Sequence, residues 1–165
     1  MTPVIRALAP DDSISELTEL MHRAYAPLLA RGLRYTAGYQ DEETTRRRIA
    51  DGECFVLILD ERIAGTITWH PPARAGGAPW YDRDGVATFQ QLCVDPPFQR
   101  RGVAKALLEH VEERARASGA TELACDTAEP AADLIAMYVS FGYRVVGSVD
   151  WDATNYASVI LSKAL

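Results

Sequence analysis

The residues whose types and spacing best suit a chemical role lie between positions 88 and 105. Residues 88–94 are mostly apolar or β-favouring, which predicts a strand, and Pro96 and Pro97 end it because proline donates no ladder hydrogen bond. A helix is predicted to begin near Arg101, since apolar residues recur at helical spacing as far as Gly119. The first turn of a helix carries unpartnered N–H groups and the positive end of the helix dipole. The strand-to-helix joint therefore predicts an anion-binding site.

The side chains at this joint suit a ligand that carries phosphate groups. Gly102 has no Cβ and Ala104 has only a methyl group, so a ligand can approach the backbone closely. Arg100, Arg101 and Lys105 add positive charge. The spacing is neither that of the Gly-x-x-x-x-Gly-Lys-Ser/Thr phosphate loop nor that of Gly-x-Gly-x-x-Gly. We expect a diphosphate carried on a long apolar arm.

The pattern Gln99-x-x-Gly102-x-Ala104 resembles the acetyl-CoA signature of the GNAT superfamily of N-acetyltransferases, usually written Gln/Arg-x-x-Gly-x-Gly/Ala. The preceding residues 92–96 resemble the fourth strand of that family and its exit. The resemblance implies acetyl-CoA as co-substrate and no metal. It places cofactor binding on Leu92, Cys93, Val94, Gln99, Arg100, Arg101, Gly102, Val103, Ala104 and Lys105.

A second block, residues 138–143, resembles the Tyr-x-x-x-Gly-Phe/Tyr motif of the same family. There the helix tyrosine is thought to protonate the leaving thiolate of CoA, which implies that Tyr138 is the catalytic acid. A phenol is a proton donor at neutral pH and can reach a substrate from a helix. The alternative is a core tyrosine on an apolar helix face; the first motif favours the acid.

Two positions depart from the fuller motif of the family. The family has an asparagine and an alanine where this chain has Ala131 and Leu134. The change removes one expected side-chain contact to the cofactor. Asp133 is a substitute for it, although its charge is a poor neighbour for phosphates.

The resemblance also implies how the thioester is activated. A backbone N–H near Cys93 or Val94 is expected to polarise the carbonyl, and the fourth and fifth strands are expected to splay apart around the cofactor arm. The sequence names no general base. Relatives often carry a carboxylate where this chain has Gln90 and Gln91, and glutamine cannot act as a base. The candidates, each also readable as a surface or turn residue, are Asp84, Asp126, Glu129 and His70.

Composition restricts the class of protein. The chain has 165 residues, 48% of them hydrophobic and 24% charged, which suits one soluble domain spanning 1–165. The net charge of −6 argues against a nucleic-acid surface, and Arg46-Arg47-Arg48 is interpreted as a solvated helix end. Three widely spaced cysteines predict buried, reduced thiols. No membrane-spanning run or signal-peptide segment is found, so a cytoplasmic location is expected.

The order of the remaining elements predicts a mixed α/β fold. Strands and helices are expected to form a twisted, mostly antiparallel sheet of about seven strands flanked by four or so helices, as in the GNAT fold. Pro27 marks the end of the first helix or a kink near it, and Glu129-Pro130 opens the last one. Residues 28–40 fit either a loop or a short helix. Strands are expected at 4–8, 54–60, 63–70, 88–94, 121–126, 143–150 and 158–162, with helices after Ser13, at 41–50, after Arg101 and around 130–141.

These observations predict an acetyl-CoA-dependent N-acetyltransferase that transfers directly, in a ternary complex, to a primary amine of a small molecule or peptide. The first helices, the loop 71–85 and the last hairpin are expected to form the acceptor pocket. Trp80 and Tyr81 in that loop either contact a ligand or anchor the loop to the core. The rival hypotheses are a non-catalytic acyl-CoA-binding module and a toxin that acetylates aminoacyl-tRNA; the acidic charge weighs against the latter. Relatives are often dimers, so a homodimer remains open.

Overall fold

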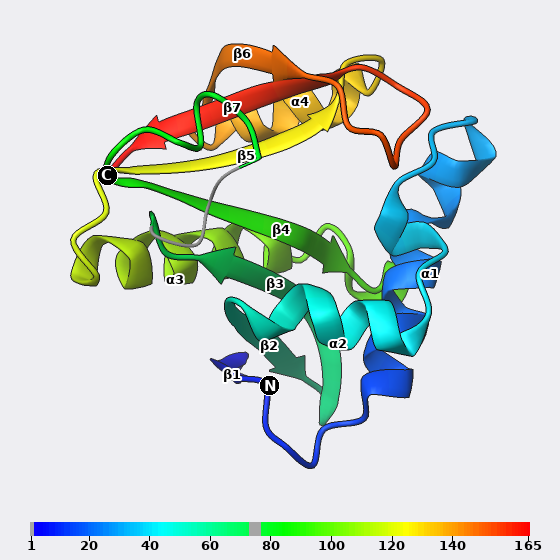
Figure 1. The fold of residues 1–165 in the computed structure, drawn as a ribbon. Coiled ribbons are helices and arrows are strands. Elements are labelled where there is room, and N and C mark those ends of the chain that lie inside the picture. Colours follow the sequence, from blue (N-terminus) through cyan, green and yellow to red (C-terminus); the bar gives the residue numbers. More distant parts are fainter. Residues whose placement is uncertain (1, 73–76) are drawn as a thin grey trace.

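The computed structural model describes residues 2–72 and 77–165 and has a mixed α/β architecture built on one sheet (Figure 1). Within the described residues the sheet has seven strands in the order β1-β2-β3-β4-β5-β7-β6. All neighbours are antiparallel except the parallel pair β4–β5. The predicted fold class is confirmed. The strands are β1 (Val4–Ala7), β2 (Glu53–Leu59), β3 (Arg62–His70), β4 (Val86–Val94), β5 (Glu122–Ala128), β6 (Arg144–Val149) and β7 (Ser158–Ala164).

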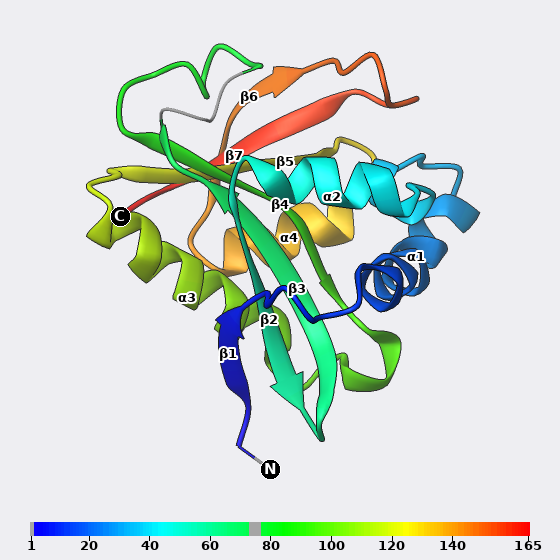
Figure 2. The same cartoon turned by 60° about the horizontal axis from the view of Figure 1, so that its bottom comes forward.

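The helices cover both faces of the sheet (Figure 2). Side chains alternate along β2, so Phe55 and Leu57 join the core under α3, whereas Cys54 and Val56 pack against α1. A helix on each face lets both sets of side chains leave water. The helices are α1 (Ile14–Ala30), α2 (Glu42–Ala50), α3 (Val103–Ala117) and α4 (Ala132–Ser140), and two short 3-10 turns are η1 (Thr36–Gly38) and η3 (Pro96–Phe98).

The strands β4 and β5 separate after a short paired segment. They pair only through Val86–Thr88 and Glu122–Ala124, and Figure 1 shows them diverging beyond it. On the other edge of β4, the register against β3 shifts, because two residues of β4 lie opposite one residue of β3. Gln91 sits in this bulge with a left-handed φ of 58°. A bulge bends its strand, which gives a physical cause for the predicted splay.

Three predicted element boundaries are wrong by a turn or less. Of the two alternatives given for Pro27, a helix end or a kink, the helix end is wrong, because α1 runs through Pro27 to Ala30. The helix α3 begins at Val103 rather than near Arg101, because Arg100 and Gly102 are left-handed, with φ of 62° and 79°. Pro130 lies before the N-cap of α4 and not in its first turn.

The structure also shows the conformation of residues 28–40 and the state of the three cysteines. Residues 28–40, which fitted either a loop or a short helix, comprise the last turn of α1, a loop at 31–35, the turn η1 and two further irregular residues. Cys54, Cys93 and Cys125 are all free and buried, as predicted. In the part of the chain that the structure describes, no helix combines the length and the apolar character needed to cross a membrane.

Candidate active site

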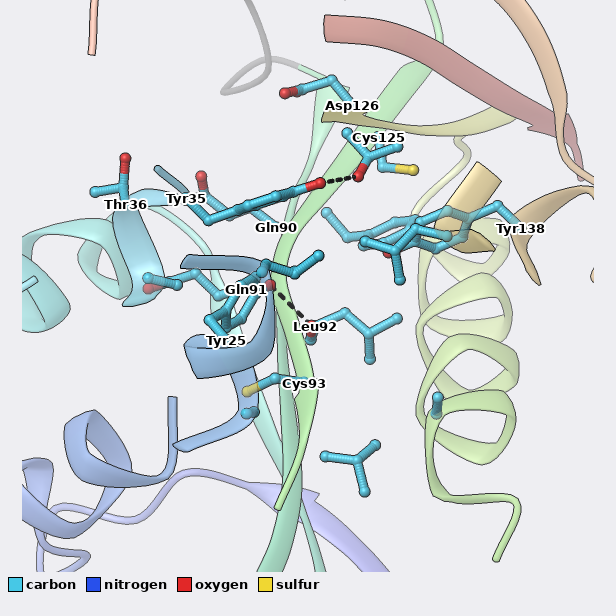
Figure 3. Close-up of a pocket in the computed structure, with 18 of the residues that line it drawn as sticks. Tyr25, Tyr35, Thr36, Gln90, Gln91, Leu92, Cys93, Cys125, Asp126 and Tyr138 are labelled. Atoms are coloured by element: carbon cyan, nitrogen blue, oxygen red, sulfur yellow. Dashed lines mark hydrogen bonds between the residues drawn. The ribbon is translucent and has the colours of Figure 1, made fainter. Parts of the chain in front are cut away.

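A cavity of about 840 Å³ opens where β4 and β5 diverge (Figure 3). It extends from the start of α3 along β4 to residues of α1, η1, α2 and the segment between β6 and β7. Tyr138 and all but one of the predicted cofactor-binding residues line it; the exception is Arg101. The lining residues among those predicted are Leu92, Cys93, Val94, Gln99, Arg100, Gly102, Val103, Ala104, Lys105 and Tyr138.

The start of α3 has the features of an anion site. Gly102 caps the helix with a φ of 79°, and a Cβ built there would meet no atom within 4 Å. No side chain caps the helix and no acidic residue stands in its first turn, so the N–H groups have no competing partner there. Arg100 lines the cavity and is exposed. A diphosphate fits this combination of bare backbone and positive charge.

The other predicted residues of this turn have local partners. Arg101 points to Asp60, with 3.8 Å between Nη1 and Oδ2, and stacks over Phe98. Lys105 lies 3.7 Å from Glu109 on the helix surface, where both side chains remain exposed. An exposed pair of this kind is weak and can yield to a ligand.

The turn is fixed to the end of β4 by side chains. Gln99 donates its Nε2–H to the carbonyl of Val94 at 3.2 Å. The buried Asp95 accepts two hydrogen bonds from Arg23 of α1, at 2.9 and 3.1 Å. These contacts hold the strand, the turn and α1 in one arrangement.

The edge of β4 that faces β5 is partly occupied by a side chain. Beyond Thr88 this edge has no ladder partner on β5. Tyr25 of α1 donates its hydroxyl to the carbonyl of Leu92 at 2.9 Å, as Figure 3 shows. One backbone group that the sequence assigned to the cofactor therefore already has a donor. The remaining groups on this edge are the ones left for a ligand amide or a thioester carbonyl.

Tyr138 enters the cavity from α4, opposite Tyr25 and Tyr35 (Figure 3). Its ring lies 6.0 Å from the rings of Phe89 and Tyr143, and the residue is 8% exposed. Among the hydrogen bonds of the described residues, none involves its hydroxyl. Burial raises the pKa of Tyr138 well above its ordinary value, and the neighbouring thiol of Cys125 raises it further. The side chain is therefore a phenol with a free hydroxyl.

Cys93 lines the cavity, but its environment suppresses reactivity. Its side chain belongs to the apolar cluster under α1, with Leu20 and Met21. Burial raises the pKa of the Cys93 thiol, and the nearby Cys54 and Asp95 act in the same direction. A thiol kept protonated is a poor nucleophile.

Of the four candidate bases, only Asp126 lines the cavity. Its Oδ1 accepts a hydrogen bond from Tyr81 at 2.7 Å and its Oδ2 accepts one from Trp151 at 2.9 Å. His70 is buried outside the cavity, where burial lowers the pKa of its imidazole. Asp84 and Glu129 are exposed and lie outside the cavity too.

The substitute proposed for the missing asparagine does not reach the cavity. Asp133 is exposed and accepts two hydrogen bonds from Arg31, at 3.0 and 3.2 Å. Ala131 is fully buried at the start of α4, while Leu134 lines the cavity with its side chain. An apolar surface therefore replaces the expected polar contact.

The far end of the cavity is formed by three tyrosines and α2. The ring of Tyr35 lies 5.5 Å from that of Tyr25 and 5.0 Å from that of Tyr156. The Tyr35 hydroxyl also hydrogen-bonds Thr127 of β5 at 2.7 Å. Arg48 of α2 lines this end, half-buried, so the interpretation of the triple arginine as a solvated helix end is wrong for its last member.

The loop after β3 contributes differently from the expectation. No described residue of 71–85 lines the cavity, and 73–76 lie outside the described residues. Tyr81 is buried in a cluster with Val86, and Arg83 stacks over the Trp80 ring at 3.8 Å. Of the two alternatives for these aromatics, anchoring the loop is the one observed. The last hairpin does contribute, through Trp151, Ala153, Thr154 and Tyr156.

Sequence reasoning did not single out the residues at the far end of the cavity. Tyr25 falls on the apolar face predicted for the first helix, and Tyr35 lies within residues 28–40, which fitted either a loop or a short helix. Tyr156 follows a turn signal and gives no pattern of its own. Their role depends on segments that the fold brings together. No group of metal-ligating side chains was found among residues 2–72 and 77–165.

Comparisons with known proteins identify the family of this chain. The model of the acetyltransferase (GNAT) family matches residues 15–143. The S-(2-succino)cysteine N-acetyltransferase of Bacillus subtilis is 30% identical over 160 residues, which cover 96% of this chain and 94% of that protein.

Solved structures share the fold at lower identity. The ribosomal-protein-S18-alanine N-acetyltransferase of Escherichia coli has a TM-score of 0.74 at 20% identity, over 99% of this chain and 94% of that one. The PaiA N-acetyltransferase of Thermoplasma acidophilum, in complex with coenzyme A, has a TM-score of 0.75 at 17% identity over the whole of both chains.

Proposed function

Since the chain belongs to the acetyltransferase (GNAT) family and is an N-acetyltransferase, we propose that it transfers an acetyl group directly from acetyl-CoA to a primary amine of a small molecule or peptide. The observation that carries this proposal is the continuity of one cavity. It joins the bare N-terminus of α3, the open edge of β4 and the Tyr138 side chain. Donor and acceptor can therefore meet without leaving the protein.

The donor is proposed to lie with its diphosphate at the start of α3. The N–H groups of residues 102–105 and the side chain of Arg100 face that end of the cavity. The amide-bearing arm follows the unpaired edge of β4 toward Tyr138. A backbone N–H near Cys93 or Val94 then polarises the thioester carbonyl.

In the proposed reaction the neutral amine attacks the carbonyl carbon of the thioester. A C–N bond forms as the C–S bond breaks, and Tyr138 gives its proton to the departing sulfur. Asp126, directly or through water, first takes a proton from the ammonium. The proton that the amide nitrogen loses after attack restores the phenol. The products are an N-acetylated amine, free CoA and one proton.

We propose a single direct transfer rather than an acetyl-enzyme. The Cys93 thiol is buried and its pKa is raised, and none of the described residues that line the cavity is a histidine. An acetyl-enzyme would need an activated nucleophile. The kinetic consequence is that both substrates bind before either product leaves.

The acceptor is the least constrained part of the proposal. The relative that spans nearly the whole chain is named for S-(2-succino)cysteine, and a second similar protein is named for the alanine of ribosomal protein S18. Both acceptors present a primary amine on an amino acid. S-(2-succino)cysteine, free amino acids, peptides beginning with alanine and simple alkylamines form the acceptor panel to test first.

The experiment is a release assay for CoA with the purified protein and this panel, read alongside calorimetric binding of acetyl-CoA. We expect binding of acetyl-CoA and amine-dependent CoA release with a mass increase of one acetyl group on the acceptor. Binding without transfer to any amine would indicate the acyl-CoA-binding module instead. Absence of acetyl-CoA binding would contradict the proposal altogether.

A further inference from the structure

Arg48 is a cation at the acceptor end of the cavity without an acidic partner in the described part of the chain. Its Nη1 donates to Oε1 of Gln40 at 2.7 Å and its Nη2 donates to Oε1 of Gln90 at 3.2 Å. Gln90 returns a hydrogen bond to the Arg48 carbonyl at 3.2 Å. These amide oxygens orient the guanidinium, but they are neutral and do not form an ion pair with it.

Other arginines near the site either have counterions or remain exposed to water. Arg47 and Arg100 also line the cavity, but both are exposed. Arg23 pairs with Asp95 at 2.9 Å, and Arg31 pairs with Asp133 at 3.0 Å. On α2 itself, Arg46 is exposed and lies 3.6 Å from Glu42. A charge that is partly removed from water without a counterion is costly. Among the described arginines that line the cavity, Arg48 is the half-buried one, so this cost falls on Arg48.

The hydrogen bonds around Arg48 determine which neighbouring side-chain groups donate and which accept. Because the guanidinium can only donate, the side-chain oxygen Oε1 of Gln40 must face Arg48. The side-chain Nε2 of Gln40 then donates to Oε1 of Gln91 at 2.8 Å. Gln40 Nε2 donates a second hydrogen bond, to Oγ1 of Thr45 at 2.9 Å, which connects the Gln40 side chain to α2. A guanidinium has five N–H donors, and two serve these oxygens. The remaining donors can serve a ligand that brings negative charge.

An opposite charge faces the same space from another element. Asp126 of β5 lines the cavity, held by Tyr81 and Trp151 through one hydrogen bond to each carboxylate oxygen. Figure 3 shows Asp126 and Gln90 on the walls of the same cavity. Burial lowers the pKa of Arg48, while Asp126 is the carboxylate that acts to raise it; an arginine remains protonated in either case. The acceptor end thus presents one fixed positive and one fixed negative group.

We propose that the acceptor is an amine that also carries a carboxylate, such as a free amino acid or an amino-acid conjugate, and that Arg48 binds that carboxylate while Asp126 receives the ammonium. This inference rests on the proposed N-acetyltransferase function and narrows its substrate class. A planar guanidinium matches a carboxylate with two parallel hydrogen bonds. The N-terminus of a longer peptide has an amide in place of that carboxylate and would leave Arg48 unpaired.

The test uses acceptors that differ only in the group that meets Arg48. L-alanine, L-phenylalanine and L-glutamate are each compared with the matching C-terminal amide, using acetyl-CoA at saturation. One charge-assisted contact predicts a preference of about 10–100-fold in kcat/KM for the acid over the amide. Equal or better use of the amides would overturn the inference while leaving the acetyltransferase function intact.

Variants assign the preference to the guanidinium. Arg48→Gln should lower kcat/KM for the acids to the level of the amides and leave the amides nearly unchanged. Arg48→Lys keeps the charge and should recover part of the preference. Arg46→Gln is the matched control, because it removes a neighbouring exposed arginine of the same helix that does not line the cavity.

The outcomes distinguish failure of the Arg48 inference from failure of the proposed N-acetyltransferase function. Equal loss for acids and amides in Arg48→Gln would show that Arg48 only supports the fold of α2, and it would contradict the inference. If that variant does not fold, the acid-to-amide ratio of the parent protein still decides the matter. Absence of transfer to every acid, amide and simple amine would contradict the proposed function, and this inference with it.

Discussion

The two ends of the cavity are built in different ways. The end at α3 is formed by one continuous segment of chain and presents mainly backbone, with a glycine at the helix start and no capping side chain. The acceptor end is formed by side chains from α1, η1, α2, β5 and the segment before β7. Backbone recognition of a fixed ligand needs only a local conformation. Recognition of a particular acceptor needs side chains that the fold assembles from distant positions.

This difference predicts two kinds of mutational effect. Changes at the α3 end should weaken the donor for every acceptor alike, because every reaction uses the same donor. Changes at the acceptor end should alter the choice among acceptors. Tyr138 lies between the two ends and should affect the chemical step itself.

The largest effect is expected from Gly102→Glu. The new carboxylate would stand in the open space beside the first turn of α3, where the diphosphate is proposed to bind. Like-charge contacts cost several kcal/mol, which predicts a loss of acetyl-CoA affinity of roughly 100-fold or more. Calorimetric titration measures it, and the loss should be the same whichever acceptor is present.

Gly119→Glu is the control for this change. Gly119 ends the same helix with a φ of 92°, and a Cβ there also meets no atom within 4 Å. Both variants therefore carry a similar backbone strain of about 1–2 kcal/mol, but only Gly102 lines the cavity. A folded Gly102→Glu protein that binds acetyl-CoA like Gly119→Glu would break the assignment of the donor end.

The second largest effect is expected from Tyr138→Phe. The substitution keeps the ring and its packing and removes only the hydroxyl. Because a thiolate leaves tolerably well without help, the effect should lie at the lower end of general-acid catalysis, about 100-fold in kcat. Acetyl-CoA affinity should be nearly unchanged. The loss should shrink with a donor thioester of a more acidic thiol.

Tyr143→Phe is the matched control, and pH gives a further check. The Tyr143 hydroxyl donates to Glu112 at 3.1 Å outside the cavity, so its loss should lower stability and spare kcat. Burial raises the pKa of Tyr138, so its protonated form persists to higher pH than a free tyrosine. Tyr138 should therefore add no fall in kcat between about pH 7 and 9. Parent-like turnover by Tyr138→Phe, with chemistry rate-limiting, would reduce Tyr138 to a core residue.

The smallest effect is expected from Cys93→Ala. The thiol packs under α1 and its pKa is raised, so it serves neither end of the cavity as a reactive group. We expect kcat to be unchanged and stability to fall by about 1 kcal/mol from the lost packing. Initial-rate plots should intersect in both proteins. Parallel plots, with acetylated Cys93 detected by mass spectrometry, would contradict direct transfer.

Much of the fold could be predicted from the sequence, because local residue patterns agreed with the structure. The strand–proline–helix order around Pro96 and the glycine stops at Gly119 and Gly142 place elements to within a few residues. The errors arose where backbone conformation decides the boundary. Arg100 and Gly102 take left-handed φ values that delay the start of α3, and α1 continues three residues past Pro27.

How far the site could be predicted from the sequence differs between the two ends of the cavity. The residues at the α3 end come from a contiguous motif, and of the predicted set only Arg101 does not line the cavity. At the opposite end, the first helices and the last hairpin were expected, but the individual residues were not, since Tyr25, Tyr35 and Arg48 have patterns typical of core or surface residues. Their meeting depends on the packing of α1, η1 and α2 against β4. The choice of Asp126 among the candidate bases likewise depends on the cavity and not on the sequence around it.

The most direct measurement is a crystal structure of the protein with CoA and an N-acetylated amino acid. We expect the diphosphate within hydrogen-bonding distance, about 3 Å, of the backbone N–H groups of residues 102–105. We expect the sulfur between β4 and β5 beside the Tyr138 hydroxyl, and the product carboxylate on the side of Arg48. A CoA molecule whose diphosphate lies away from the start of α3, or whose sulfur lies out of reach of Tyr138, would contradict the account.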